Sequence, residues 1–289
     1  MTTATCWAFT SIFFTIGGQR VGSVTVNRVR LVFAAVFLMA TNLIITGQLL
    51  PLSAEPNRWF WLGLSGIVGL VIGDAMLFQA FVMIGTRIPI LLLSLVPVIS
   101  TFEAWVFLDE TLSLVEILGI VLTVGGIAWV VADKNRNHKS VESKKLMIGV
   151  LLGIGGAFGQ ATGLILSKRG LYGDFPAVSG NLIRMIAAVA VMWLLTIFMG
   201  KAKSTIVKLK DSKARLAILG GAIFGPFIGV WMSLVAIKLA RIGIASTIMA
   251  LAPVLAIPLV RWIFKERITI HAILGTTLAI IGVAVLFVG

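Results

Sequence analysis

Residues that commonly carry metal and redox chemistry are scarce in this chain. Cys6 is the single cysteine, which excludes an internal disulfide. The two histidines, His138 and His271, lie far apart in the sequence and have no metal-ligand spacing. We therefore expect no metal site, no cofactor and no redox activity.

Charged residues are also few. They make up 12% of the 289 residues, whereas hydrophobic residues make up 59% and the mean hydropathy is +1.08. Soluble domains carry about a quarter charged residues, so this composition predicts an integral membrane protein. The net charge of +13 does not indicate nucleic-acid binding, because the basic residues lie in short connectors between apolar runs.

Long apolar runs dominate the chain. A helix needs about 20 apolar residues to cross roughly 30 Å of hydrocarbon. Helices are expected rather than strands, because lipid offers the backbone no hydrogen bonds and the runs do not alternate. The start has no basic region or small-residue cleavage site of a signal peptide, so the first run is interpreted as a span. The predicted spans are 2–18, 26–47, 58–83, 86–108, 112–132, 146–167, 177–199, 216–238, 243–264 and 268–288.

The two halves of the chain match each other at a spacing of 156 residues. A polar linker, 133–145, separates the halves, and each half holds five predicted spans, so the second half enters the membrane in the opposite sense. We predict an all-α integral membrane protein with ten transmembrane helices as two inverted five-helix repeats, 1–132 and 146–289. The matching residues are Gly69, Gly73, Met76, Ala80, Leu95, Pro97, Val98, Glu110, Gly119 and Gly126, which recur as Gly225, Gly229, Met232, Ala236, Leu251, Pro253, Val254, Glu266, Gly275 and Gly282.

The connectors predict an orientation. Most of their Lys and Arg residues follow the odd-numbered spans, in particular within 134–145 and 201–215. Positively charged connectors face the cytoplasm, so linker 133–145 is predicted to be cytoplasmic and both termini outside, in the cytoplasmic (plasma) membrane.

One polar string occurs in both halves. Asn27 and Arg30 stand three residues apart at the start of the second span, and Asn181 and Arg184 repeat this spacing at the start of the seventh. Residues three apart share a helix face. Either the pairs line the pathway and attract a carboxylate-bearing solute, or they snorkel to the lipid headgroups or brace a neighbouring helix.

Asp74 is the most unusual charged residue, because it lies well inside the third span. Its counterpart in the second half is the apolar Val230, which favours a single-copy role. A buried carboxyl is a candidate for proton coupling or for an ion pair with Arg30 or Arg184; a permanent structural pair is the alternative. Glu103 in the fourth span is a second coupling candidate, although it also lies close enough to the span end to snorkel.

Other polar and aromatic residues are weaker candidates. Gln160, Gly163 and Ser167 share one face of the sixth span, which either lines a cavity or lets two helices approach closely. Trp7 and Trp231 are candidates for an apolar wall around the solute, or for the aromatic belt at the membrane interface.

Glycine, proline and glutamate residues repeat in both halves. The glycines Gly69, Gly73, Gly225 and Gly229 have the four-residue spacing of close helix packing. Pro97 and Pro253 are predicted to bend their helices in mid-span and to act as hinges. Glu110 and Glu266 are expected to cap the helices that they begin.

These residues resemble the EamA-type transporters of the drug/metabolite transporter superfamily. The resemblance covers almost the whole chain and rests on Trp7-Ala8, on Gly73-Asp74-Ala75, and on the repeated blocks 97–119 and 253–275. It implies ten helices in two repeats, and a substrate among amino acids, other metabolites, drugs and dyes. Family members are generally described with both termini in the cytoplasm, which conflicts with the charge distribution; we keep the orientation that the charges predict.

The leading functional hypothesis is a secondary transporter that works by alternating access. It would move a small organic solute together with protons or in exchange for them. The chain has no phosphate-binding loop for ATP, so a gradient must supply the energy. Its expected partners are the solute, protons and lipid, without nucleic acid, and no oligomer is required. The alternatives are an intramembrane lipid-modifying enzyme, which needs a catalytic cluster that the chain lacks, and a non-transporting sensor or assembly protein.

Overall fold

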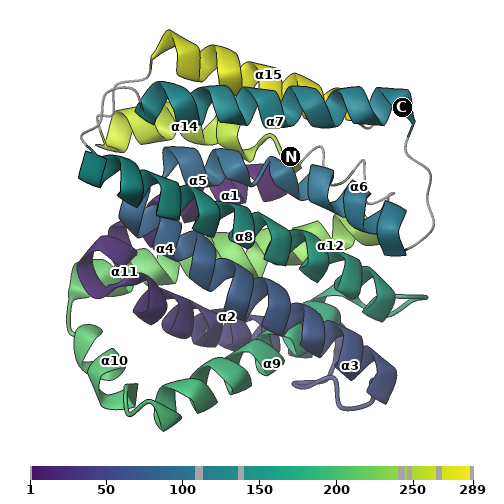
Figure 1. Cartoon of the computed structure of the whole chain (residues 1–289). Helices are drawn as coiled ribbons and strands as arrows, with labels where there is room; N and C mark the ends of the chain where they lie inside the picture. The colour runs from purple at the N-terminus through teal and green to yellow at the C-terminus, as the bar shows by residue number, and fades with distance from the viewer. Residues whose placement is uncertain are drawn as a thin grey trace.

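A computed structural model describes residues 2–107, 113–135, 140–239, 245, 249–264 and 269–286 of the chain. Every regular element in these ranges is helical, which confirms the predicted all-α class (Figure 1). Glu110 and Glu266 lie outside the described residues. In the first half the helices are α1 Thr2–Val21, α2 Ser23–Thr46, α3 Pro56–Ser65, η1 Gly66–Gly73, α4 Asp74–Ile84, α5 Arg87–Leu92, α6 Leu95–Phe107 and α7 Leu114–Asn135. In the second half they are α8 Ser140–Gly170, α9 Ala177–Phe198, α10 Ala202–Lys208, α11 Ser212–Ala222, η2 Ile223–Gly229, α12 Val230–Leu239, α14 Ala252–Phe264 and α15 Ile270–Leu286.

Six helical segments in the described part of the chain are long and apolar enough to cross a membrane, whereas the sequence predicted ten spans. The fourth predicted span is split between α5 and α6, and α14 and α15 are shorter apolar helices. The six segments are Ser23–Thr46, Pro56–Ile84, Leu114–Asp133, Ser143–Gly170, Ala177–Phe198 and Ser212–Leu239.

The same irregularity interrupts one long helix in each half. The π-helical turns η1 and η2 end at Gly73 and Gly229, which are matching residues at the spacing of 156. A π-helix widens the turn and shifts the pattern of backbone hydrogen bonds, and such turns occur frequently at functional sites. The sequence repeat is therefore also a structural repeat, down to a local distortion.

The two repeated prolines lie at helix starts rather than in mid-helix. Pro97 is in the first turn of α6, directly after a turn at Leu93–Ser94 that separates α6 from α5. Pro253 is the second residue of α14. The first N–H groups of a helix have no partner within it, so proline costs little there. The predicted bend within a continuous helix is therefore wrong, because the helix has already ended before each proline.

Equivalent helices of the two halves run antiparallel in contact with each other. In α7 and α15, Gly126 faces Gly275 and Ala279, whereas Gly119 faces Gly282 and Leu286. As the residue number rises along α7, that of its neighbour falls along α15. Figure 1 shows this pair along one edge of the molecule and the α2–α9 pair towards the opposite edge. This is the geometry expected for inverted repeats.

The helices that lie between these two pairs pack against helices of the other half. Helix α1 of the first half packs against α11 and η2 of the second, and α8 of the second packs against α3, η1 and α4 of the first. Close approach in the second contact depends on small residues, since Gly159 lies against the backbone of Gly73 and Gly163 against that of Gly69. The two halves thus share one core rather than forming two separate bodies.

Connectors group at the two ends of the helices. At one end, Arg20 forms a 2.8 Å ion pair with Asp211. The hydrogen bond from Arg20 and that from the N–H of Ala214 lower the pKa of Asp211 below its ordinary value. At the other end, Arg58 donates to the carbonyls of Gly170 and Tyr172 at 3.3 and 2.7 Å. Helix α10 lies in the connectors at the Arg20–Asp211 end, and the sequence did not predict it.

Candidate functional site

A buried ion pair lies where the two halves meet. Asp74 follows η1 directly, and its carboxylate pairs with the guanidinium of Arg30 on α2. Gln160, on α8 of the second half, donates to the other carboxylate oxygen at 2.5 Å. Arg30 is 2% exposed and Asp74 4% exposed. Of the two partners that the sequence left open for Asp74, Arg30 is the one that it pairs with, and Gln160 joins the pair from the other repeat.

The π-helical turn holds Arg30 in place. Arg30 donates through Nε to Oδ1 of Asn27 at 2.9 Å and through Nη2 to the carbonyl of Leu70 at 3.2 Å. The amide of Asn27 donates to the same carbonyl at 3.2 Å. The guanidinium also lies over the ring of Phe78, 4.7 Å from its centroid, in a cation–π contact. Asn27 thus acts as a support for Arg30 rather than as part of the cavity surface.

The second half repeats only part of this arrangement. Asn181 donates to the carbonyl of Pro226 at 2.9 Å, and Pro226 matches Leu70 at the spacing of 156. Arg184 is 2% exposed, but its Nε and Nη1 have no hydrogen-bond partner in the ranges that the structure describes, and Oδ1 of Asn181 has none there either. The residue that matches Asp74 is Val230. The polar string found twice in the sequence is therefore fully hydrogen-bonded in one half only.

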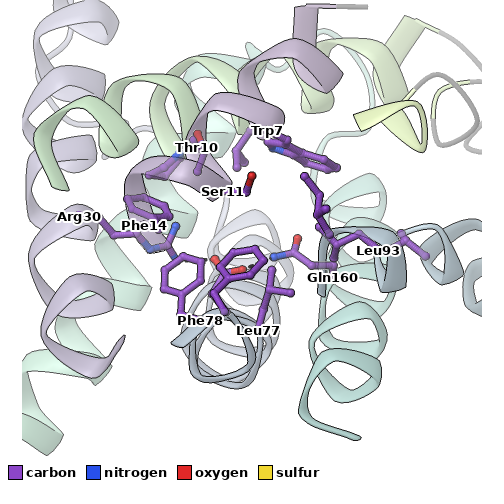
Figure 2. A pocket seen from close by; sticks show the side chains of 16 residues that line it. Trp7, Thr10, Ser11, Phe14, Arg30, Leu77, Phe78, Leu93 and Gln160 are labelled. Carbon is purple, nitrogen blue, oxygen red and sulfur yellow. Dashed lines mark hydrogen bonds and ion pairs between the residues drawn. The ribbon is translucent and has the colours of Figure 1, made fainter. Parts of the chain in front are cut away.

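A cavity of about 60 Å³ lies beside the ion pair. A cavity of this volume has room for a few water molecules. Figure 2 shows Trp7, Thr10 and Ser11 coming from one helix on one side of this space, opposite Leu77 and Phe78. Its walls are largely aromatic and aliphatic. The lining residues are Trp7, Thr10, Ser11, Phe14, Arg30, Asp74, Leu77, Phe78, Phe81, Ile90, Leu93, Val96, Gln160, Gly225, Pro226 and Val230.

A smaller cavity adjoins the first and shares Trp7, Leu93 and Val96 with it. Pro97 and Pro253 both line this second space, so the helix breaks of the two halves face each other across it. Helix breaks, aromatic side chains and the ion pair therefore lie around two neighbouring cavities that share part of their wall.

Several predicted site residues lie elsewhere. Ser167 is in hydrogen-bond contact with Ser65 at 2.7 Å and braces α8 against α3. Trp231 stacks on Phe227, with ring centroids 6.2 Å apart. Glu103 accepts a hydrogen bond from Thr162 on α8 while its second oxygen has no partner. None of these side chains is part of the cavity lining.

Sequence reasoning missed part of the lining on α1. Thr10, Ser11 and Phe14 follow Trp7 at three, four and seven residues, which is the spacing of one helix face. This pattern was visible in the sequence. Sequence reasoning also missed the role of Glu116, which forms a capping box with Ser113: each side chain accepts from the other's backbone N–H, at 2.7 and 3.1 Å.

Among the described residues, no group of three His, Cys, Asp or Glu side chains lies close enough together to hold a metal ion. The charged groups at the cavity are Arg30 and Asp74, with the amide of Gln160 between α8 and α4. This arrangement provides hydrogen bonds, one ion pair and apolar contact area. It is chemically suited to binding an organic molecule.

Comparison with known proteins identifies the family. The sequence profile of the EamA-like transporter family matches residues 1–132 and 147–288. The chain belongs to the EamA-like transporter family. The chain is therefore a multi-pass membrane protein of a transporter family within the drug/metabolite transporter superfamily.

A likeness to solved structures extends over the whole fold. One crystal structure matches with a TM-score of 0.69 and 15% sequence identity, covering 98% of this chain and 94% of the other. At this identity the likeness shows the fold alone. A search of curated proteins found no match.

Proposed function

We propose that this protein is a secondary transporter that moves a small organic solute through the central cavity by alternating access. The observation that supports this most strongly is the composition of the cavity wall. Helices of both halves contribute to it, and the buried Arg30–Asp74 pair is completed by Gln160 from the second half. A site divided between two inverted repeats changes shape when one repeat moves against the other.

The transport cycle that we propose opens one end of the bundle while the other stays closed. Thr15 and Thr86 are in hydrogen-bond contact at 2.8 Å, and Ser23 donates to Gln79 at 2.6 Å, on the side of the cavity towards Arg20 and Asp211. The Arg20–Asp211 pair, which joins the two halves, would separate when that end opens, whereas these two contacts hold helices of the first half together. Pro97 and Pro253 would act as hinges, because the helices are already interrupted next to them.

For the membrane arrangement, we propose ten crossings in two repeats, 1–132 and 146–289, joined by the cytoplasmic linker 133–145. The shorter helices α14 and α15 would complete the second repeat as α6 and α7 complete the first. The grouping of connectors at two ends of the bundle supports this arrangement. Ser140 and Ser204 would then be labelled from the cytoplasmic side only.

For the energy source, we propose coupling to protons through Asp74, with Glu103 as the second candidate. Asp74 must leave Arg30 to take up a proton. Among the residues that the structure describes, Glu103 has one oxygen without a partner and forms no ion pair that would have to break. The two carboxyls can therefore be separated experimentally, because only the Asp74 variants alter the cavity lining.

The test is solute flux in proteoliposomes under an imposed pH step. We would measure uptake of labelled amino acids, monocarboxylates and cationic dyes into vesicles with the protein and into empty vesicles. Protein-dependent flux that follows the pH step, and loses this response in Asp74→Asn, is the expected result. Asp174→Asn, which alters an exposed carboxylate in a connector, is the control. Equal flux in empty and protein-containing vesicles for every solute class would contradict a transport function.

A further inference from the structure

Three buried charged groups lie around η1, and their charges do not cancel. Arg30 comes from the first half and Arg184 from the second, and both are 2% exposed. Asp74 supplies the negative charge at the end of η1, and it forms its ion pair with Arg30. No described carboxylate forms an ion pair with Arg184. The cluster therefore carries one more positive than negative charge.

The unpaired arginine points towards the first half rather than staying with its own repeat. Its Nη2 would lie 3.5 Å from a Cβ built on Gly69, in the middle of η1. The equivalent of the Arg30–Asn27 hydrogen bond is absent, because Nε of Arg184 and Oδ1 of Asn181 both lack partners. The N–H of Asp74 donates to the carbonyl of Gly69, the residue that Arg184 approaches, so Asp74 lies one turn along η1 from that point, and its single carboxylate can fully neutralise only one of the two arginines.

A buried charge without a partner is costly, so proteins normally pair it or use it to bind a ligand. The cavity next to the cluster contains Arg30 but not Arg184. A ligand that entered the cavity would therefore meet Arg30 first. The surplus positive charge disfavours a cation there, and no second carboxylate among the described lining residues is available to offset it.

We propose that the transported solute is an organic anion, with a carboxylate that binds Arg30 while Asp74 turns from Arg30 to Arg184. This inference rests on the proposed transport function. With the anion bound, each arginine has one negative partner, and the net charge of the cluster falls to zero. The exchange needs no new charged residue, because Asp74 already lies near both arginines.

The rest of the cavity defines the remainder of the solute. Trp7, Phe14, Phe78 and Phe81 form much of its wall, and Thr10 and Ser11 provide hydroxyl groups. Aromatic walls favour an apolar or aromatic body on the solute. The chemistry of these walls matches a monocarboxylate with an aliphatic or aromatic substituent, and the cavity, which here has room for a few water molecules, must widen to admit it.

The first experiment compares acids with their own amides. Purified protein in lipid nanodiscs is titrated with butanoate, hexanoate, phenylacetate and 3-phenylpropanoate, with the corresponding primary amides, and with phenethylamine. Thermal unfolding reports binding, because a ligand of the folded state raises the unfolding temperature. At least one acid is expected to stabilise the protein at a tenfold lower concentration than its amide. If every acid and its amide act at equal concentrations, or if phenethylamine acts at the lowest, the inference is overturned.

The second experiment restores the missing charge. Val230→Asp places a carboxylate in the second half at the position that matches Asp74, so Arg184 gains a partner of its own. The tenfold preference for acid over amide is expected to disappear, whereas the uncharged control Val230→Asn keeps it. Arg184→Gln removes the surplus charge directly and should also remove the preference, which provides a test if Val230→Asp does not fold. A preference that survives in both charge variants rules out the surplus charge as its cause.

Failure of the inference and failure of the transport function give different results. Flux of neutral or cationic solutes without any preference for acids would retain the transporter and reject the anion site. Preferential binding of acids without protein-dependent flux would retain the anion site and reject the transport function.

Discussion

The Asn-x-x-Arg string occurs in both halves of this protein, where its asparagine makes the same contact but its arginine does not. In both, an asparagine donates to a carbonyl in a π-helical turn, Leu70 in the first half and Pro226 in the second. In the first half, Asp74 then completes the hydrogen bonding of Arg30, whereas with Val230 at the matching position Arg184 has no counter-ion among the described residues. One side chain at a duplicated position therefore decides whether a buried arginine is paired. The two halves share the same backbone arrangement, and the difference between Asp74 and Val230 determines whether the arginine forms an ion pair.

Removing the paired arginine is expected to have the largest effect. Arg30→Met breaks the ion pair with Asp74 and the hydrogen bonds from Arg30 to Asn27 and Leu70, so the free energy of unfolding should fall by about 3–5 kcal/mol if Asp74 keeps its position and by less if Asp74 turns to Arg184. Denaturant titration of the purified protein, followed by tryptophan fluorescence, measures this change. If the loss were no greater than for Arg184→Met, the two arms would be energetically equal despite their different contacts.

Where the two halves are truly equivalent, matched substitutions should have equal effects. A Cβ on Gly126 would lie 2.5 Å from the backbone nitrogen of Ala279, and one on Gly282 would lie 2.4 Å from that of Thr123, which matches Ala279. Gly126→Ala and Gly282→Ala should each cost about 1–3 kcal/mol, because α7 and α15 must move apart. Unequal unfolding midpoints for the two variants would show that the symmetry does not extend to this pair.

Gly125→Ala is the control for this pair, because a Cβ there meets nothing within 4 Å. It should leave the unfolding midpoint unchanged or slightly higher, since alanine is the better helix former. A loss as large as that of Gly126→Ala would mean that helix propensity, rather than the contact between helices, decides the effect.

Removing the unpaired arginine is expected to change stability little. Arg184→Met replaces a buried cation, which forms no ion pair within the described part of the chain, by an apolar side chain of similar length. The free energy of unfolding should stay within about 1 kcal/mol of the wild type or rise. The same denaturant titration tests this, and a loss as large as that of Arg30→Met would reveal a strong interaction of Arg184 that its contacts do not account for.

The smallest effect should come from the helix starts that differ between the halves. Asp211 begins α11 and accepts from the N–H of Ala214, whereas its counterpart Glu55 makes no such cap at α3. The pKa of Asp211 is lowered by Arg20 and this N–H, so its contribution is present above its ordinary pKa of 3.8 and is lost as the pH falls below that. Thermal unfolding between pH 7 and 3 should show a steeper loss in the wild type than in Asp211→Asn. Parallel profiles would contradict this contribution.

The sequence by itself determined the helical membrane class, the twofold repeat and the short list of polar residues that includes Arg30, Asp74 and Gln160. These follow from local properties: apolar run length, a fixed spacing between matching residues, and the cost of a charge within a span. The family resemblance drawn from these residues was correct. The aromatic and hydroxyl residues on the cavity side of α1 were also readable, since their spacing follows one helix face.

Only the tertiary structure decided which arginine Asp74 pairs with, and that Gln160 reaches the same carboxylate from the other half. The sequence left Arg30 and Arg184 open as partners, because the distance between side chains on different helices depends on how those helices cross. The π-helical turns and the helix breaks before Pro97 and Pro253 were likewise not predicted. The π-helical turns end at the matching glycines Gly73 and Gly229 and the breaks lie just before the two prolines, but a changed pattern of backbone hydrogen bonds depends on how the surrounding helices pack and leaves no periodic pattern of side chains.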